Sequence, residues 1–470
     1  MTKLFVEGND NMIISPLKID DEFLVTIKRI GINGEGIGYY KRQAVFIPGA
    51  LVDEEVVAKC TRVAKGYSEA ELIRVKKKSP NRVKPKCSLY GKCGGCQLQH
   101  MSYEEQLIVK RKMLMHAVER YADMPINLLE KITCPTLGME NPYAYRNKAS
   151  MPVAQNEDGL IVGLYEINSR RLIPVDDCPI HYEGVNDVIE AAVDLLDEFM
   201  VYPYNYKSKK GTIRHLVVRQ SRISKEVQVT FVMANDSFPK MDALARELMQ
   251  QRPEVKSVFK SINKGETDHE IFGVDATLIR GKETINDTLG HLKFNLSAKS
   301  FYQLNSEQTL VLYNEVRRAA AITKNENVID AYCGVGTIGQ FLSKDAKIVR
   351  GVDTNSDAIA DAIKNAKVNK LENTYYEVGD AAVIVPKWVK KGFNPDVMVV
   401  DPPRSGLDTK MLQLILQVKP KTLIYVSCNP STLAKNLSKL RGQYKIEYLQ
   451  PIDMFPQTSN IETVVKLVLK

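Results

Sequence analysis

The sequence lacks any long hydrophobic run. No apolar stretch approaches the ~20 residues that span a bilayer, and the N-terminus, MTKLFVEGND, has no apolar segment like that of a signal peptide. No internal repeat stands out at the periods of solenoid proteins. We therefore expect a cytoplasmic protein that does not contact a membrane. We also expect a monomer.

Cysteine is also scarce. Eight cysteines in 470 residues, outside any small secreted scaffold, argue against a disulfide framework and suggest metal binding or catalysis. Three of them, Cys87, Cys93 and Cys96, are spaced C-x5-C-x2-C in CSLYGKCGGC. A fourth ligand has to come from elsewhere, and both Cys134 in TCPT and Cys178 in DDCPI precede a proline. The spacing alone does not separate zinc from an iron–sulfur cluster.

Positive charge is only in modest excess. The net charge of +9 favours a polyanionic partner, although it is weak evidence by itself. Residues 17–75 hold short β-rich runs punctuated by glycine, which predict a small barrel. The next stretch carries seven Lys or Arg within residues 74–86. Such a stretch is often a solvated linker, but beside a small barrel it favours a nucleic-acid groove.

The middle of the chain gives no diagnostic fold. Residues 102–124 have apolar residues at helical spacing and a capping box from Ser102 to Glu105, which predict a helix. Residues 141–285 mix strands with two helical stretches, around 184–200 and 239–251.

The last third contains a nucleoside-binding pattern. An apolar strand runs into the glycine-rich turn Gly334-x-Gly336-x-x-Gly339 and then into a helix, and Asp353 ends the next strand. The glycines let a ligand approach the backbone, and the carboxylate accepts hydrogen bonds from ribose hydroxyls. This pattern alone fits a dinucleotide-binding dehydrogenase and an S-adenosylmethionine methyltransferase equally well.

Two features favour the methyltransferase. Only about 135 residues follow the turn, enough for one single-nucleoside fold without a separate substrate domain. Two later strands end in chemically active residues, Asp401 in DPPR and Cys428 in SCNP. Because ligands of open parallel sheets bind beyond the carboxyl ends of the strands, both side chains should face the cofactor pocket.

A lone cysteine after an apolar strand is more often an inert core residue. Cys428, however, is followed by Asn-Pro-Ser-Thr, which opens the next helix. The thiol should therefore lie near a helix N-terminus, where the partial positive charge favours thiolate. Cys333 lies inside the glycine turn, where packing is the better explanation.

Seven motifs occur in order, namely CSLYGKCGGC, YRNKASMPV, FYQLN, DAYCGVGTIG, DPPRSGL, VSCNPSTLAKNL and DMFPQTSNIETV. Over residues 17–470 the chain resembles the RNA uracil-C5 methyltransferases, specifically the iron–sulfur, TRAM-domain branch that methylates 23S ribosomal RNA. The resemblance implies an α/β protein with an oligonucleotide-binding-type TRAM barrel (17–75) and an α+β central domain with the cluster (76–285). A Rossmann-like methyltransferase domain (286–470) follows, on which the helix at 102–124 could pack.

The resemblance also implies the ligand sets. A [4Fe-4S] cluster would be held by Cys87, Cys93, Cys96 and Cys178, because Cys134 leads into YRNK, where the family has no cluster ligand. Zinc is the chief alternative metal, since four thiolates suit it equally. S-adenosylmethionine would be bound by Gln303, Tyr332, Gly334, Asp353 and Asp401. Gln303 could equally be a polar surface residue on a loop.

The implied mechanism needs two further groups. C5 of uracil is too weak a nucleophile to take a methyl group directly, so the Cys428 thiolate would first add at C6. Glu462 matches the family's general base for the C5 proton, although a glutamate capping a strand is ordinarily a solvated charge. The family often has histidine two residues before this glutamate, whereas this chain has Asn460. The target base must also leave its stack.

Two other functional classes stay open. A transfer-RNA uracil methyltransferase would share Cys428 and Glu462 but would usually lack the TRAM barrel and the cluster cysteines. A noncatalytic RNA-binding protein would explain the barrel and the basic stretch but not Cys428 and Glu462. The expected partner is 23S ribosomal RNA.

Overall fold

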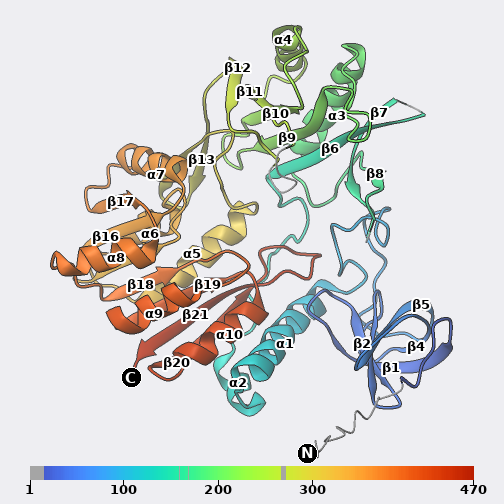
Figure 1. Ribbon diagram of the computed structural model, residues 1–470, viewed down its shortest axis with the longest axis vertical. Helices are drawn as coiled ribbons and strands as arrows, with labels where there is room; N and C mark the ends of the chain where they lie inside the picture. The colour runs from blue at the N-terminus through green and yellow to red at the C-terminus, as the bar shows by residue number, and fades with distance from the viewer. Residues whose placement is uncertain (1–14, 158, 168, 266–270) are drawn as a thin grey trace, which may run out of the picture. The chain divides into compact units, whose positions relative to one another are not determined.

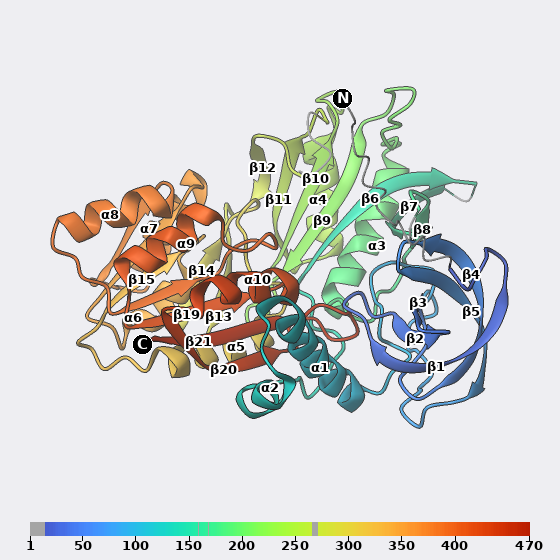
Figure 2. The same cartoon turned by 60° about the horizontal axis from the view of Figure 1, so that its bottom comes forward.

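The computed structural model describes residues 15–157, 159–167, 169–265 and 271–470. Residues 1–14, for which the sequence predicts no signal peptide, lie outside the described residues. The chain forms two units (Figures 1 and 2). The barrel unit comprises the described part of Met1–Pro85 with Cys96–Val109 and Gln457–Ser459, and the sheet unit comprises Lys86–Gly95, Lys110–Pro456 and Asn460–Lys470.

The barrel unit contains a closed barrel of strand order β1-β2-β3-β5-β4. Its strands are β1 (Glu22–Ile30), β2 (Gly36–Tyr40), β3 (Gln43–Ile47), β4 (Glu55–Ala64) and β5 (Tyr67–Lys77). Alternate residues of β1, such as Val25 and Ile27, point into a core shared with Val45 and Ile47. The period of two seen in the sequence therefore corresponds to barrel strands, as predicted.

The basic stretch at 74–86 is not one uniform linker. Its first residues belong to β5, which extends to Lys77. Arg82 binds the fully buried Glu54 carboxylate through two nitrogens, at 2.6 and 2.7 Å. Burial alone would raise the pKa of Glu54, but Arg82 and two backbone N–H groups lower it. Six of the seven cations are exposed, whereas Arg82 is bound to Glu54.

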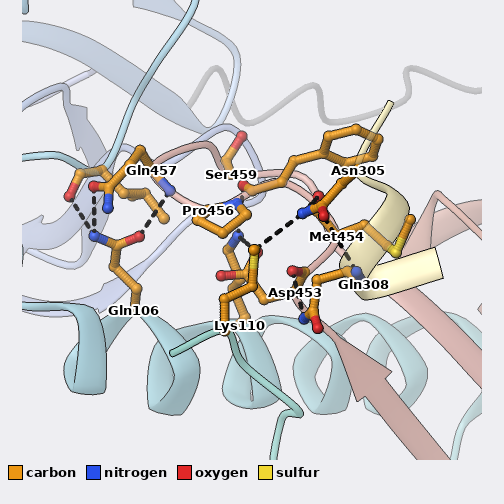
Figure 3. A network of polar contacts seen from close by, with 12 residues as sticks. Gln106, Lys110, Asn305, Gln308, Asp453, Met454, Pro456, Gln457 and Ser459 are labelled. Carbon is orange, nitrogen blue, oxygen red and sulfur yellow. Dashed lines mark hydrogen bonds and ion pairs between the residues drawn. The ribbon is translucent and has the colours of Figure 1, made fainter. Parts of the chain in front are cut away.

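Helix α1 (Tyr103–Ala122) begins in the barrel unit, as the capping box predicts. The Ser102 hydroxyl accepts from the Glu105 N–H at 3.4 Å, and the Glu105 carboxylate accepts from the Asn81 amide at 2.9 Å. One turn further on, the buried Gln106 side chain exchanges hydrogen bonds with Gln457 (Figure 3). These bonds join residues 351 positions apart.

The first sheet of the sheet unit has the order β12-β11-β10-β9-β6-β7-β8. Its strands are β6 (Lys148–Asn156), β7 (Gly159–Tyr165), β8 (Leu172–Pro174), β9 (Ile213–Gln220), β10 (Val227–Met233), β11 (Val255–Ile262) and β12 (Ala276–Gly281). The two helices predicted in this region are α3 (Glu183–Glu198) and α4 (Met241–Gln251). Both helices share one core with the sheet, in which Leu196 and Leu244 pack near Val218 and Val229.

The second sheet is mostly parallel, in the order β17-β16-β15-β18-β19-β21-β20. Its strands are β15 (Asn327–Ala331), β16 (Ile348–Asp353), β17 (Thr374–Val378), β18 (Val397–Val400), β19 (Thr422–Ser427), β20 (Tyr444–Ile452) and β21 (Glu462–Leu469). Strand β21 runs antiparallel to both of its neighbours, β19 and β20. The remaining neighbours in this sheet pair in parallel.

Two layers cover this second sheet. One core contains residues of α2 (Ile126–Ile132), α8 (Ala381–Lys390), α9 (Thr409–Val418), α10 (Pro430–Leu440) and the second half of α1. The other core contains residues of α5 (Ser306–Ala320), α6 (Thr337–Ser343) and the hairpin β13 (Ile285–Leu289) and β14 (Leu292–Leu296). Helix α7 (Ser356–Val368) contacts β14, β16 and β17. The alternating strands and helices form the doubly covered α/β sheet that the sequence predicts.

A buried ion pair connects α1 to the segment before β21. The Lys110 ammonium lies 2.5 Å from the Asp453 carboxylate, and neither side chain is exposed to solvent (Figure 3). Lys110 also donates to the Phe455 carbonyl oxygen at 3.2 Å. Beyond Lys110, Leu114 and Val118 of α1 enter the core of the second sheet.

None of the helices in the described part of the chain is both long enough and apolar enough to cross a bilayer.

The buried ion pair predicts a large effect of a single substitution. Lys110→Met should lower the free energy of unfolding by about 3–5 kcal/mol, because it leaves the Asp453 carboxylate buried without a counter-charge. Adding Asp453→Asn should recover part of this loss, since it removes the stranded charge. Denaturant titration measures both changes. Lys260→Met, whose partner Asp236 is largely exposed, is the control and should change little, whereas an equal loss in the control would contradict the assignment.

Candidate active site

Four predicted side chains come from strands of the second sheet and lie at one of its edges. Asp353 ends β16, Asp401 follows β18 and Cys428 follows β19, so all three lie at the carboxyl edge of the parallel strands. Glu462 begins β21, and because β21 is antiparallel its first residue lies at the same edge. Ser427 pairs with Thr463, so the next positions in register are Cys428 and Glu462.

A different structural feature accounts for each glycine of the turn after β15. Gly334 has φ +52° and open space around the position of an added Cβ. At Gly336, φ is +77° and a Cβ would lie 2.8 Å from the Tyr376 ring. Gly339 donates its N–H to the buried Asp330 carboxylate at 2.7 Å and lies against β16. The open space at Gly334 is what close approach of a nucleoside requires.

Asp353 holds the glycine turn in place. One carboxylate oxygen accepts from the Gly334 N–H and the other from the Asn355 N–H, both at 2.9 Å. Each oxygen retains a further lone pair for a ligand hydroxyl. The backbone thus holds the Asp353 carboxylate in a fixed position, from which it fits the role of accepting hydrogen bonds from ribose hydroxyls.

Two other predicted cofactor residues, Tyr332 and Asp401, follow strands at this edge, and the third, Gln303, lies before α5. Tyr332 has φ +63°, a conformation that strains a bulky residue by about 1–3 kcal/mol, and burial raises the pKa of its phenol to about 12. Burial also raises the pKa of Asp401 to about 7. Gln303 precedes α5, and its backbone oxygen accepts from the Asn147 amide at 2.9 Å.

Cys428 lies where the sequence predicts, directly before the Asn429 cap of α10. The expected effect on ionisation is wrong, however. Burial, followed by the carboxylates of Glu462 and Asp401, raises the pKa of the half-buried thiol to about 11. Arg404 and the backbone N–H of Cys428 act in the opposite direction but do not prevail. Desolvation outweighs the effect of the helix terminus, so the pKa of this thiol rises instead of falling.

Glu462 is not the solvated charge that its position in the sequence ordinarily suggests. It is only 8% exposed. Burial and then Asp401 raise its pKa well above the usual range, while Arg404 lowers it. A buried carboxyl group with a raised pKa beside a thiol is a typical arrangement for groups that transfer protons.

Sequence reasoning missed Arg404, although it belongs to the DPPR motif. Its backbone oxygen accepts from the Asn429 amide and the Thr432 hydroxyl, both at 3.1 Å. Its guanidinium donates to the Asn460 side-chain oxygen at 2.9 Å. Arg404 therefore contacts the segment after Cys428 and the segment before Glu462. The asparagine found where the family often has histidine accepts this bond.

The predicted metal ligands are only partly brought together. Burial raises the pKa of Cys178, the N–H groups of Ile180 and His181 oppose this, and nearby Cys87 and Cys93 add to the increase. Cys134 has other charged neighbours, and its N–H donates to Leu449 in β20. Across the residues that the structure describes, no three His, Cys, Asp or Glu side chains converge to hold a metal ion.

Comparisons with known proteins agree with this architecture. A TRAM-domain profile matches residues 17–73, and a profile described as tRNA (Uracil-5-)-methyltransferase matches residues 384–470. An uncharacterized RNA methyltransferase of Bacillus anthracis is 50% identical over 97% of this chain and 98% of its own length. One from Halalkalibacterium halodurans is 45% identical over 96% of this chain and 97% of its own.

A solved structure is similar over nearly the whole chain. The Pyrococcus abyssi tRNA (uracil-54, C5)-methyltransferase, in complex with S-adenosyl-L-homocysteine, has a TM-score of 0.74 and 26% identity. The match covers 95% of this chain and 100% of that one. The second sheet thus has the fold of S-adenosylmethionine-dependent methyltransferases, and the barrel is a TRAM domain. The chain belongs to the RNA uracil-5 methyltransferase family.

Proposed function

We propose that this protein methylates C5 of uridine in 23S ribosomal RNA through a covalent adduct with Cys428. The observation that carries the proposal is the register of β19 and β21, which brings Cys428 and Glu462 to one edge of the sheet. The choice of ribosomal RNA rests on the combined TRAM barrel and cysteine motif. Such a substrate implies that the enzyme works in the cytoplasm, and we expect a monomer.

A uridine in transfer RNA is the second candidate substrate. It is favoured by the similarity to the archaeal tRNA enzyme over the whole chain, its N-terminal part included. The TRAM barrel therefore does not exclude a transfer-RNA substrate. The catalytic chemistry would be the same for either RNA.

S-adenosylmethionine, when bound, supplies an electrophilic methyl group. Gly334 offers the open backbone for its nucleoside, and Asp353 offers acceptors for ribose hydroxyls. Asp401 and Tyr332 lie at the same edge, and we include Gln303 in the set. Asp401 raises the pKa values of both Cys428 and Glu462. Positive charge on a cofactor bound near Asp401 would lower both pKa values again.

The reaction requires two proton transfers on the protein. Cys428 loses its proton to solvent and its sulfur bonds to C6, while the C5–C6 π electrons make C5 nucleophilic. After C5 has gained the methyl group, the Glu462 carboxylate removes the C5 proton. The electrons of that C–H bond restore the C5–C6 double bond and expel the thiolate. The uracil must be turned out of its stack to reach these groups.

We also propose a [4Fe-4S] cluster on Cys87, Cys93, Cys96 and Cys178. Four thiolates are the usual ligands of such a cluster. Cys87 and Cys93 lie close enough to Cys178 to raise its pKa, and two backbone N–H groups face its sulfur. Cys134 has other neighbours, so these contacts support Cys178 as the fourth ligand. The thiols do not form a closed ligand set in the structure, and we assign the cluster no step in the reaction.

The covalent mechanism predicts different failures for two variants. Cys428→Ala should abolish methylation but still bind S-adenosylmethionine, because its side chain does not form the nucleoside site. Glu462→Gln should accumulate a methylated protein–RNA adduct that survives denaturing electrophoresis, since the amide cannot remove the C5 proton. Sequencing the trapped RNA identifies the substrate, and adducts confined to transfer RNA would overturn the ribosomal assignment. Full turnover by Glu462→Gln would exclude Glu462 as the base.

The raised pKa of Cys428 predicts a steep pH dependence of alkylation. Between about pH 7.5 and 9.5, iodoacetamide labelling should rise about tenfold per unit, because thiolate remains the minor form below a pKa of about 11. Glu462→Gln should speed labelling at a given pH, and Arg404→Gln should slow it, since Glu462 raises and Arg404 lowers this pKa. Asn460→Ala, which retains the Arg404 charge, is the control. Peptide mass spectrometry that shows a plateau near pH 9 would contradict the assignment.

The cluster proposal predicts about four irons per chain in protein purified without oxygen. Cys178→Ser should lose the iron and its brown absorbance, and Cys134→Ser, the matched control, should keep both. Elemental analysis and visible spectroscopy measure the result. Stoichiometric zinc without iron would replace the cluster with a zinc site.

A further inference from the structure

The loop between α3 and β9 concentrates exposed aromatic and basic side chains. Tyr202 and Tyr206 are 60% and 58% exposed, and Lys207, Lys209 and Lys210 are exposed beside them. Residues 199–212 contain no Asp or Glu. Single exposed apolar residues are ordinary, but an aromatic group gathered with charge of one sign suggests a binding surface.

The backbone of this loop is held by hydrogen bonds. The Asn205 side-chain oxygen accepts from the Lys207 and Ser208 N–H groups at 2.9 and 3.0 Å. Its backbone N–H donates to the Lys210 oxygen at 2.8 Å, and the Lys209 N–H returns a bond to Asn205 at 2.8 Å. At Gly211, φ is +92° and a Cβ would lie 2.0 Å from the Pro203 oxygen. The lysines and tyrosines therefore project from an ordered turn, which lowers the entropy lost on binding.

Arg214 fixes the tyrosine rings from behind. Its guanidinium lies 4.7 Å from the Tyr204 ring centre and 4.8 Å from that of Tyr206. The two rings are 5.3 Å apart in an edge-on arrangement. Arg214 is itself buried and donates to the backbone and side-chain oxygens of Asn263. Because Arg214 covers one side of the Tyr206 ring, the exposed remainder is a prepared stacking face.

The surface extends to the turn between β7 and β8. Tyr165 is 48% exposed, and Tyr206 lies near enough to contribute, after burial, to its raised pKa. The nearby Glu166 is neutralised by two hydrogen bonds from Arg171, at 2.6 and 3.0 Å. The backbone of this turn also pairs with the cysteine segment, because the Tyr165 oxygen accepts from the Gly94 N–H at 3.2 Å.

We propose that this tyrosine–lysine surface (Tyr165, Tyr202, Tyr206, Lys207, Lys209 and Lys210) binds a single-stranded segment of the RNA substrate. Bases stack on the tyrosine rings and phosphates contact the lysines, the combination that single-strand binders use. The inference rests on the proposed function, since it assigns a further contact to the same RNA. The surface belongs to the sheet unit, so it is a different contact from the TRAM barrel.

The test is binding of a fluorescent oligouridine RNA of about 20 nucleotides to the full-length protein, measured by anisotropy at several salt concentrations. Tyr206→Ala should weaken binding by about fivefold or more through lost stacking, while Tyr206→Phe should retain wild-type affinity. Changing Lys207, Lys209 and Lys210 together to Ala should weaken binding about tenfold. It should also reduce the salt slope by about 2, near 0.7 for each of three phosphates.

The matched control changes the exposed Lys387, Lys390 and Lys391 of α8 and its C-terminus to Ala. This control also removes three positive charges, but from a helix that covers the second sheet. It should leave RNA affinity near wild type. All variants should bind S-adenosylmethionine normally, since none lies at the carboxyl edge of the second sheet.

Two results would overturn the inference while leaving the proposed function intact. One is wild-type RNA affinity and salt slope in both Tyr206→Ala and the triple lysine variant. The other is that these variants lose binding only to phosphatidylserine vesicles and not to RNA, which would make this a membrane-binding surface. Failure of the wild-type protein to bind any RNA would instead refute the proposed function itself.

Discussion

The buried pair of Lys110 and Asp453 is the constraint on which the active edge depends. Asp453 lies in the segment between β20 and β21, and its backbone oxygen also accepts from Gln308 of α5 at 2.9 Å. Lys110 donates in addition to Phe455, and the Tyr145 hydroxyl donates to Pro456 at 3.0 Å. Helices α1 and α5 thereby fix the chain shortly before it reaches Glu462. Few other conformations of the segment before β21 would keep these two buried charges paired. The position of this segment is therefore tightly restricted.

The sequence predicts much of this edge because the relevant signals are local. A glycine turn after an apolar strand, and strands that end in Asp401 and Cys428, are read within a few residues of each other. Parallel pairing then brings separate strand ends to one side of the sheet. Glu462 differs, because it begins a strand, and it joins the site only because β21 is antiparallel. No residue near Glu462 in the sequence indicates that β21 runs antiparallel, so the assignment of Glu462 came from the family resemblance.

The failed expectations involve partners distant in sequence. The helix terminus beside Cys428 is visible in the sequence, but Glu462 and Asp401, which oppose its effect, come from other strands. In the sequence Arg82 is one more cation of a basic stretch. In the structure it donates to the carboxylate of Glu54, 28 residues earlier. Arg404 and Asn460 meet across 56 residues. Long-range electrostatics and hydrogen bonds depend on the fold, so periodicity cannot supply them.

The order of strands leaves β20 at one end of the second sheet. β20 pairs with β21 and not with β19, although β20 follows β19 along the chain. An end strand presents backbone N–H and C=O groups with which another chain can pair. Residues 134 and 137 donate their N–H groups to backbone oxygens of β20, and residues 133 and 137 bridge to it in parallel. The segment leading to YRNK therefore covers part of this edge and protects the sheet from pairing with a second chain.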